Sequence, residues 1–217
     1  TAIVVEGAMT IGKGANLSDD EMDILLIAAW FHDTGYVHTT VDHEVESVLI
    51  ATTFLKQEHA GEKLIASVAA CILATKADVQ PEEKLHQVIR DSDMFHLSKD
   101  NYNDLALHLR QEWSTLYDKN YNDLEWNHLN LDFLSSHEFH TDYAKENLLV
   151  SKEKIKKEIR KKIKKLEKNV DLKLIEDLGV TAGELKSLKK KLQKAEGRPE
   201  RGIETMFRLT SKNHIDI

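Results

Sequence analysis

The chain places a histidine directly before an aspartate, His32-Asp33, and carries two more aspartates far along the sequence, Asp91 and Asp93. A neutral imidazole and carboxylate oxygens are ligands that suit divalent manganese, iron, cobalt, nickel or zinc. Folding would have to bring a distant aspartate to the pair. Spacing alone leaves a second interpretation open, in which a buried His-Asp pair makes ordinary hydrogen bonds and holds no metal.

The two distant aspartates are expected to play different roles. Residues two positions apart on a helix point in different directions, so only one of them should reach a site at residues 32–33. Helical spacing alone leaves open which of Asp91 and Asp93 is the ligand. The other one would cap a helix or support one of the ligands.

Helical periodicity determines where these residues lie. Ser18-Asp19-Asp20-Glu21 matches a capping box before an apolar run, which predicts a helix with His32-Asp33 at its far end, stopped by Thr34-Gly35-Tyr36. Asp42 is expected to cap the next helix, which opens with His43-Glu44. Further helices are predicted at about 59–75, 81–94 with Pro81 in its first position, 101–118, 123–137 and 140–168, and no strand is predicted.

Composition indicates a soluble globular protein of one domain with an appendage. Of the 217 residues, 41% are hydrophobic and 31% charged. The single Cys71 has no partner for a disulfide, which favours a reducing compartment such as the cytoplasm. The chain shows no signal-peptide pattern and no run of about 18 uncharged apolar residues, so no membrane span is expected.

Charge is distributed unevenly along the chain. Residues 1–150 carry 10 Lys and Arg against 26 Asp and Glu, and residues 151–217 carry 20 against 11. This asymmetry predicts a ligand-binding or catalytic body joined to a basic tail with a different role. An acidic body would repel a polyanionic substrate unless bound cations reverse the field at the site.

The basic tail has a narrow apolar stripe within 151–168 and a second one after a break at Gly179 and a cap at Thr181–Glu184. The stripes consist of Ile155, Ile159, Ile163 and Leu166, and of Leu185, Leu188 and Leu192. The simplest interpretation is a solvated helical hairpin that packs on the body or on a partner. A nucleic-acid or membrane-surface role is the alternative. The segment 151–168 contains no aromatic residues between its basic residues, and this absence gives no support to nucleic-acid binding.

Three segments of the body, in the right order, resemble the HD-domain phosphohydrolase superfamily. Residues 28–36 (AAWFHDTGY) resemble its defining segment, residues 43–47 (HEVES) resemble the following segment of one branch, and residues 89–97 (IRDSDMFHL) resemble the helix with the last metal ligand. The resemblance covers about residues 1–150. It implies an all-α helical bundle that hydrolyses phosphomonoester, phosphodiester or nucleoside-polyphosphate bonds with a divalent metal ion.

The resemblance assigns metal-ligand roles by position. His32, Asp33 and Asp93 match the metal ligands of the superfamily, and Asp33 would also orient or deprotonate a metal-bound water. The first histidine ligand of the superfamily normally precedes a Thr-x-x-Val-Val pattern, and this chain opens with Thr1-Ala2-Ile3-Val4-Val5. We therefore expect that histidine immediately upstream of residue 1, which leaves the ligand set one short within the sequence.

Four more residues receive roles, each with a plain alternative. His43 would protonate the leaving oxygen or join a second metal, or be a solvent-facing histidine at a helix start. Glu44 would orient water or support His43, or be a first-turn carboxylate favoured by the helix dipole. Thr75 and Lys76 stand where two-metal relatives have another histidine, which favours one metal. Both are predicted to bind the substrate, with Lys76 as a phosphate contact, and the alternative for Lys76 is a surface lysine.

Five other histidines are expected to be surface or core residues: His59, His86, His96, His108 and His128. His137 and His140 are three residues apart and could share one helical face as ligands. No pattern of nearby carboxylates supports a second metal site there.

Residues 201–215 resemble the stretch that precedes the membrane-spanning part of Pycsar-type effectors, which are bacterial antiphage membrane proteins triggered by cyclic nucleotides. The predicted organisation is an HD-type domain at 1–150, a basic helical extension at 151–197 and a segment at 198–217 leading to an effector domain. A parent protein of this kind would lie at the inner membrane with this region facing the cytoplasm.

The predicted function is metal-dependent hydrolysis of a phosphate ester or anhydride of a nucleotide or cyclic nucleotide. The expected partner is therefore a phosphorylated small molecule, with homodimerisation and without nucleic acid. The alternative is a catalytically silent HD-fold module that senses a nucleotide or dimerises, and so regulates an attached membrane effector.

Overall fold

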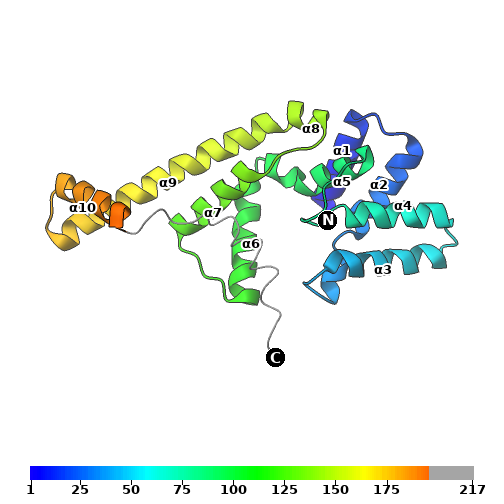
Figure 1. The fold of residues 1–217 in the computed structure, drawn as a ribbon, viewed down its shortest axis with the longest axis horizontal. Helices are drawn as coiled ribbons and strands as arrows, with labels where there is room; N and C mark the ends of the chain where they lie inside the picture. The colour runs from blue at the N-terminus through cyan, green and yellow to red at the C-terminus, as the bar shows by residue number, and fades with distance from the viewer. Residues whose placement is uncertain (196–217) are drawn as a thin grey trace. The chain divides into compact units, whose positions relative to one another are not determined.

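The fold class is all-α, as predicted. The computed structural model describes residues 1–195, and all regular structure within that range is helical (Figure 1). The resemblance at residues 201–215 and the predicted segment 198–217 lie outside the described residues. In chain order the elements are α1 (Ala2–Gly14), α2 (Asp19–Phe31), the 3-10 helix η1 (Thr34–Val37), α3 (His43–Gln57), α4 (Glu62–Leu73), α5 (Lys84–Asp93), the 3-10 helix η2 (Met94–Ser98), α6 (Tyr102–Tyr117), α7 (Asp123–Ser136), α8 (Asp142–Asn147), α9 (Leu149–Leu178) and α10 (Ala182–Ala195).

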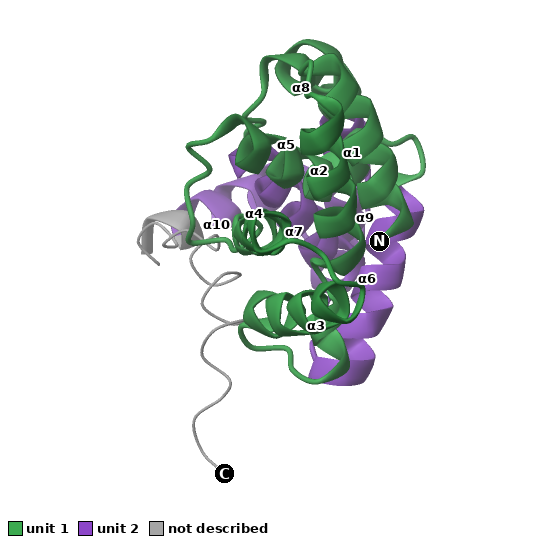
Figure 2. Cartoon of the chain, turned by 90° about the vertical axis from the view of Figure 1, so that its right-hand side faces the viewer, with its two compact units in different colours: residues 1–102, 138–153 green, residues 103–137, 154–217 purple. Residues whose placement is uncertain are grey.

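The chain forms two compact units, and each contains two separate stretches of sequence (Figure 2). The first unit consists of residues 1–102 and 138–153, and the second consists of residues 103–137 together with the chain from 154 onward. The predicted domains are continuous in sequence, whereas these units are not. The limits 1–150 and 151–197 therefore stay a prediction about function and do not describe how the chain packs.

The first unit is built around α2, which packs against α1, α4 and α5, while α3 packs against η1 and α4. Apolar side chains from these helices are fully removed from solvent in one core. They include Ile11, Leu25, Val68, Ile72, Val88 and Ile89. Burial of this kind stabilises the folded state by about 1.5–3 kcal/mol per large aliphatic side chain. The ends of α2 and α5, which carry the predicted ligands, are held by this core.

Two predicted helix starts are confirmed by their hydrogen bonds. Ser18 accepts a hydrogen bond from the amide of Glu21, and the carboxylate of Glu21 accepts one from the amide of Ser18, at 3.4 and 2.8 Å. Thr181 and Glu184 repeat this pattern before α10, at 3.3 and 2.8 Å. Each exchange satisfies two amides that the first helical turn leaves without partners.

Other predicted boundaries are wrong for identifiable reasons. Asp42 precedes α3 in a left-handed conformation (φ 49°), but its side chain makes no capping bond because it binds Lys76 instead. Pro81 is buried in the connection, and α5 begins three residues later at Lys84. The helix predicted at 140–168 is two helices, α8 and α9, which meet at Leu148, and the second continues to Leu178.

Aromatic and polar contacts hold parts of the second unit together. The rings of Trp113 and Trp126 meet edge to face at 5.7 Å, and Tyr121 lies 6.2 and 5.9 Å from them. Arg110 donates to the carboxylate of Asp123 at 2.8 Å and to the carbonyl of Tyr121. These contacts join α6 to the start of α7 across the turn between them.

The first apolar stripe of the basic tail is confirmed. Ile155, Ile159 and Ile163 are buried, as is Leu185 in α10. Leu188, which the second predicted stripe also contains, is 43% exposed. The lysines between the buried isoleucines therefore line the solvent side of α9.

Across the described residues, none of the helices is both long enough and apolar enough to cross a membrane.

Candidate metal centre

His32 caps the C-terminus of α2 and is 1% exposed. Its Nδ1 lies 2.9 Å from the carbonyl oxygen of Ala29, and because a carbonyl can only accept, Nδ1 carries the hydrogen. Its Nε2 is buried and makes no hydrogen bond of good geometry. A buried polar atom without a partner is uncommon in a folded protein and calls for a physical explanation.

Two carboxylates face that unpartnered nitrogen. Nε2 of His32 lies 3.1 Å from Oδ2 of Asp33 and 3.4 Å from Oδ1 of Asp93. Ligands about 2.1 Å from a divalent ion stand about 3.0 Å apart in octahedral and about 3.4 Å apart in tetrahedral coordination. Both observed separations therefore match neighbouring ligands of one ion.

These three donors nevertheless do not form a finished coordination sphere. Within residues 1–195, no group of three or more His, Cys, Asp or Glu side chains is arranged so that it could hold a metal ion as it stands. The donor types and the two separations from the unpartnered nitrogen suit a divalent ion, whereas the three side chains as they stand do not form a site for one. The side chains of Asp33 and Asp93 are 40% and 22% exposed.

Electrostatic coupling within the group is strong. Burial alone would lower the pKa of His32, but the carboxylates of Asp33 and Asp93, which can accept hydrogen bonds only once Nε2 is protonated and attract that positive charge, outweigh it and raise the pKa to about 10. Burial alone would raise the pKa of Asp33, but hydrogen bonding to His32 and His43 and their positive charges hold it well below its usual range. Without a metal, a proton on Nε2 can therefore neutralise part of the acidic charge.

His43 and Glu44, at the start of α3, lie beside the group. Nε2 of His43 is 3.4 Å from Oδ1 of Asp33, and its Nδ1 is 3.5 Å from Oε2 of Glu44. The ring of Tyr36 stacks on the His43 imidazole at 3.8 Å with an 18° tilt. His43 is thus oriented between two carboxylates and an aromatic face, and it is not a solvent-facing histidine.

A close backbone contact places His43 there. Gly35 packs so tightly that a Cβ built on it would lie 2.0 Å from the carbonyl oxygen of His43. The amide of Gly35 also donates to the buried Ser47 hydroxyl at 2.8 Å. Gly35 was predicted only to stop a helix, and no role was predicted for Ser47. A close approach between two chain segments leaves no local pattern in the sequence.

The two aspartates of α5 point to different partners. Asp93 faces His32, whereas Asp91 is fully buried and accepts hydrogen bonds from the amides of His140 and Thr141 at 2.8 Å and from the Thr141 hydroxyl at 2.7 Å. Burial raises the pKa of Asp91 although these hydrogen bonds act against it. Asp91 thus anchors the start of α8, where Thr141 is the capping residue.

The predicted phosphate contacts are already engaged. Lys76 forms an ion pair with Asp42 at 2.6 Å, and the Thr75 hydroxyl donates to the carbonyl of Ile72 at 2.7 Å. Arg90, which sequence analysis did not single out, donates to the carbonyls of Ala74, Thr75, Lys76 and Ala77. This guanidinium fixes the end of α4 to α5, and so fixes the backbone of Lys76 relative to the helix of Asp93.

Among residues 1–195, the other histidines are not seen to add a ligand to this group. His137 and His140 do not share a helical face, because residues 137–140 lie between α7 and α8 without helical structure, which removes the possibility raised for them as paired ligands. His96 stacks with Tyr102 and lies with Nδ1 3.2 Å from the carbonyl of Asp93. Burial lowers the pKa of His96.

No protein-family model, curated protein or solved structure matches this chain.

Proposed function

We propose that this chain is a metal-dependent phosphohydrolase that acts on a phosphate ester or anhydride of a nucleotide or cyclic nucleotide. The observation that carries the proposal is the buried, unpartnered Nε2 of His32 facing the carboxylates of Asp33 and Asp93. The order of the three HD-like segments supports the reaction class. The nucleotide part rests on the resemblance alone.

The residues that would hold a divalent ion are His32, Asp33 and Asp93. A bound ion supplies Lewis acidity and activates water for attack on phosphorus. Asp33 has its second oxygen, Oδ1, 3.4 Å from Nε2 of His43. Asp33 can therefore orient the attacking water, and a protonated His43 beside it can deliver a proton to the oxygen that leaves phosphorus.

Charge explains why a cation would be needed for substrate binding. Asp33 and Glu44 lie beside His43, and Asp93 lies beside His32, while Lys76 is paired with Asp42. A phosphate group approaching this site meets excess negative charge. Binding of the phosphate is therefore expected only when a divalent ion reverses the local field.

The test measures metal content, and turnover of a panel of phosphomonoesters, phosphodiesters and nucleoside polyphosphates, on the full chain and on the chain extended upstream. Asp33→Ala should abolish metal-dependent turnover, and Asp93→Asn should lower the affinity for the ion. The matched control is Asp132→Asn, an exposed aspartate of α7. Turnover that persists in Asp33→Ala would contradict the proposal.

A specific contact favours a second candidate, a nucleotide-sensing module without catalysis. Asp91 is two residues from Asp93 and anchors Thr141, whose segment leads through α8 into α9. A ligand that repositions α5 could thereby shift the chain that follows. Protein that binds a nucleotide, holds no metal and never turns it over would support this module and exclude the hydrolase.

A further inference from the structure

The hairpin formed by α9 and α10 contains an open groove of about 770 Å³ in the second unit. The two helices are joined by a turn with Gly179 in a left-handed conformation (φ 62°). The floor of the groove is apolar and consists of Leu172, Ile175, Ala182 and Leu185. Its walls are charged and consist of Lys164, Glu167, Lys168, Asp171, Lys186, Lys189 and Lys190.

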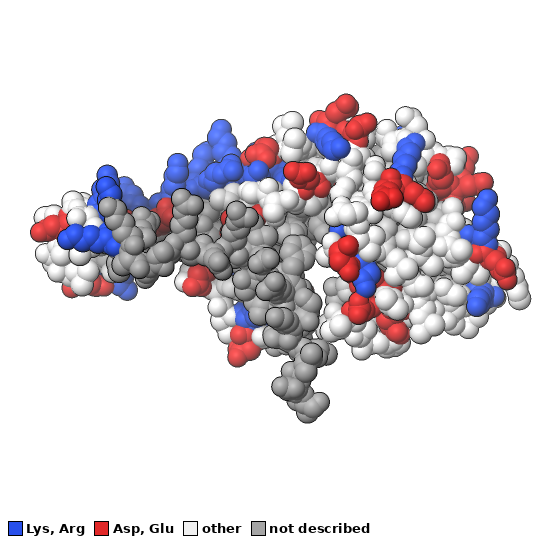
Figure 3. Space-filling model, viewed as in Figure 1, with Lys and Arg blue, Asp and Glu red and all other residues white. Residues whose placement is uncertain are grey.

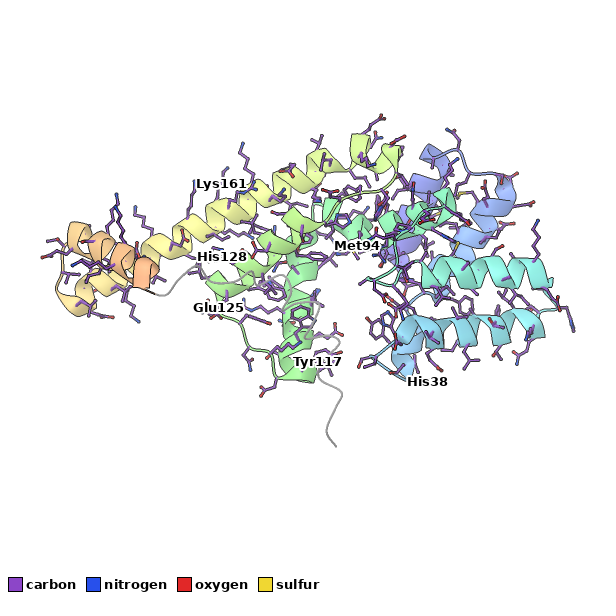
Figure 4. All side chains as sticks on the ribbon, in the orientation of Figure 1. His38, Met94, Tyr117, Glu125, His128 and Lys161 are labelled. Atoms are coloured by element: carbon purple, nitrogen blue, oxygen red, sulfur yellow. The ribbon has the colours of Figure 1, made fainter. Side chains whose placement is uncertain are left out.

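Positive charge exceeds negative charge around the groove. Both acidic residues have partners, because Asp171 pairs with Lys189, and Glu167 lies 3.8 Å from His128. The other lysines on the walls, Lys164, Lys168, Lys186 and Lys190, are exposed and form no ion pair within the described part of the chain. Lysines and arginines gather over α9 and α10 (Figure 3), and Lys161 points away from the ribbon of α9 (Figure 4).

Large apolar side chains are exposed among these lysines. Leu172 is 55% exposed on the groove floor, and Leu178, directly before the turn, is 58% exposed. Leu188 and Val170 are exposed as well. A surface that places leucines in water beside unpaired lysines is suited to a ligand with both negative charge and hydrocarbon.

We propose that the α9–α10 hairpin docks on an anionic phospholipid surface. Lys164, Lys168, Lys186 and Lys190 bind the headgroup phosphates, and Leu172 and Leu178 enter the boundary between headgroups and acyl chains. Nucleic acid would satisfy the lysines but would leave the leucines exposed to water. The proposal stands on the second unit alone and does not depend on the hydrolase proposal.

Co-sedimentation of the full chain with vesicles tests this. One set of vesicles contains phosphatidylcholine, and the other contains phosphatidylcholine mixed with phosphatidylglycerol. We expect binding to the second set only, weakened by salt. Lys168→Gln with Lys186→Gln should lower the partition coefficient about 5-fold per lysine. Leu172→Ser with Leu178→Ser should lower it about 10-fold or more per leucine.

Matched controls come from exposed residues elsewhere in the chain. Lys13→Gln with Lys56→Gln, and Leu107→Ser with Leu116→Ser, remove the same groups outside the hairpin and should leave binding unchanged. Circular dichroism of every variant shows whether the helices persist. Variants that keep their helices and lose vesicle binding support the proposal.

Three outcomes would overturn it. The first is equal binding to both kinds of vesicle, or none to either. The second is binding to duplex DNA that the lysine variant loses and the leucine variant retains, which would assign the hairpin to nucleic acid. The third is self-association in analytical ultracentrifugation that the hairpin variants abolish without vesicle binding, which would assign it to a second copy of the chain.

Discussion

Oδ1 of Asp93 lies 3.4 Å from Nε2 of His32, although the two residues end different helices of the first unit, α5 and α2. Both helices pack in the same apolar core, so packing determines this approach before any ligand binds. Two residues earlier on α5, Asp91 faces away from this site and accepts hydrogen bonds that hold the start of α8. The same short helix therefore carries both a candidate ligand and a structural anchor.

This separation predicts different defects for two isosteric variants. Asp91→Asn should lower the free energy of unfolding by about 1–3 kcal/mol, because an amide nitrogen would face the buried donors of His140 and Thr141. Asp93→Asn should lower the free energy of unfolding of the metal-free protein less than Asp91→Asn does. It should nevertheless weaken the binding of a divalent ion. Urea denaturation and calorimetric titration with manganese measure the two effects. The reverse pattern would mean that Asp91 is the ligand.

Local signals in the sequence were sufficient to predict some of the helix starts and the different directions of Asp91 and Asp93. The capping boxes at Ser18 and Thr181 depend on residues three apart, and both formed as predicted. Helical geometry predicted that Asp91 and Asp93 would point to different partners, and the resemblance predicted which of them faces residues 32–33. In contrast, no helix was predicted over residues 2–14, because the segment has no capping signal, and its Thr1 makes no side-chain capping bond.

Contacts between distant segments account for what the sequence did not reveal. Asp42 reads as a helix cap, but Lys76 lies 34 positions away and takes its carboxylate. The anchor between Asp91 and Thr141 joins residues 50 positions apart. Such pairings depend on the packing of α3, α4 and α5, and a single sequence contains no local pattern for them.

Gly35 should tolerate no side chain. In Gly35→Ala the new Cβ would meet the backbone of His43, which cannot rotate away, so the free energy of unfolding should fall by about 3 kcal/mol. Displacement of His43 should also reduce any turnover. The matched control is Gly61→Ala, because a Cβ at Gly61 meets nothing within 4 Å, and the change there should stay below about 1 kcal/mol. Equal thermal midpoints for both variants would refute the close contact.

The capping box of α2 predicts a pH dependence of stability. Hydrogen bonds from the backbone and side chain of Ser18 lower the pKa of Glu21 below its ordinary value of about 4.5. Because the folded-state pKa is depressed, this contribution is present above about pH 4.5 and is lost as the pH falls through the lower value. Ser18→Ala should cost about 1 kcal/mol at neutral pH and less at acidic pH. A cost that stays constant from pH 7 to acid, measured by urea denaturation, would exclude the Glu21 contribution.

Cys71 should be chemically silent in the folded protein. The thiol is fully buried in the core of the first unit, and burial, aided by the negative charge of Glu83, raises its pKa to about 12. Because the thiolate is the reactive form, labelling with a maleimide near pH 7 should proceed only as fast as the core opens. Labelling should become rapid in denaturant. Fast stoichiometric labelling of the native protein would show that α4 opens far more readily than its packing implies.

The ion pair between Lys76 and Asp42 predicts opposite effects of two variants on a turnover assay. If Lys76 contacts the substrate phosphate, Lys76→Gln should raise KM about 10-fold, since a charge-assisted hydrogen bond is lost. Asp42→Asn should lower KM roughly 2- to 5-fold, because Lys76 would no longer have to break its ion pair with the Asp42 carboxylate before it binds the substrate phosphate. Arg90 holds the carbonyl of Lys76 in both variants, so the backbone should keep its place. If both variants raise KM and lower the thermal midpoint together, the pair serves only to join α3 to the end of α4.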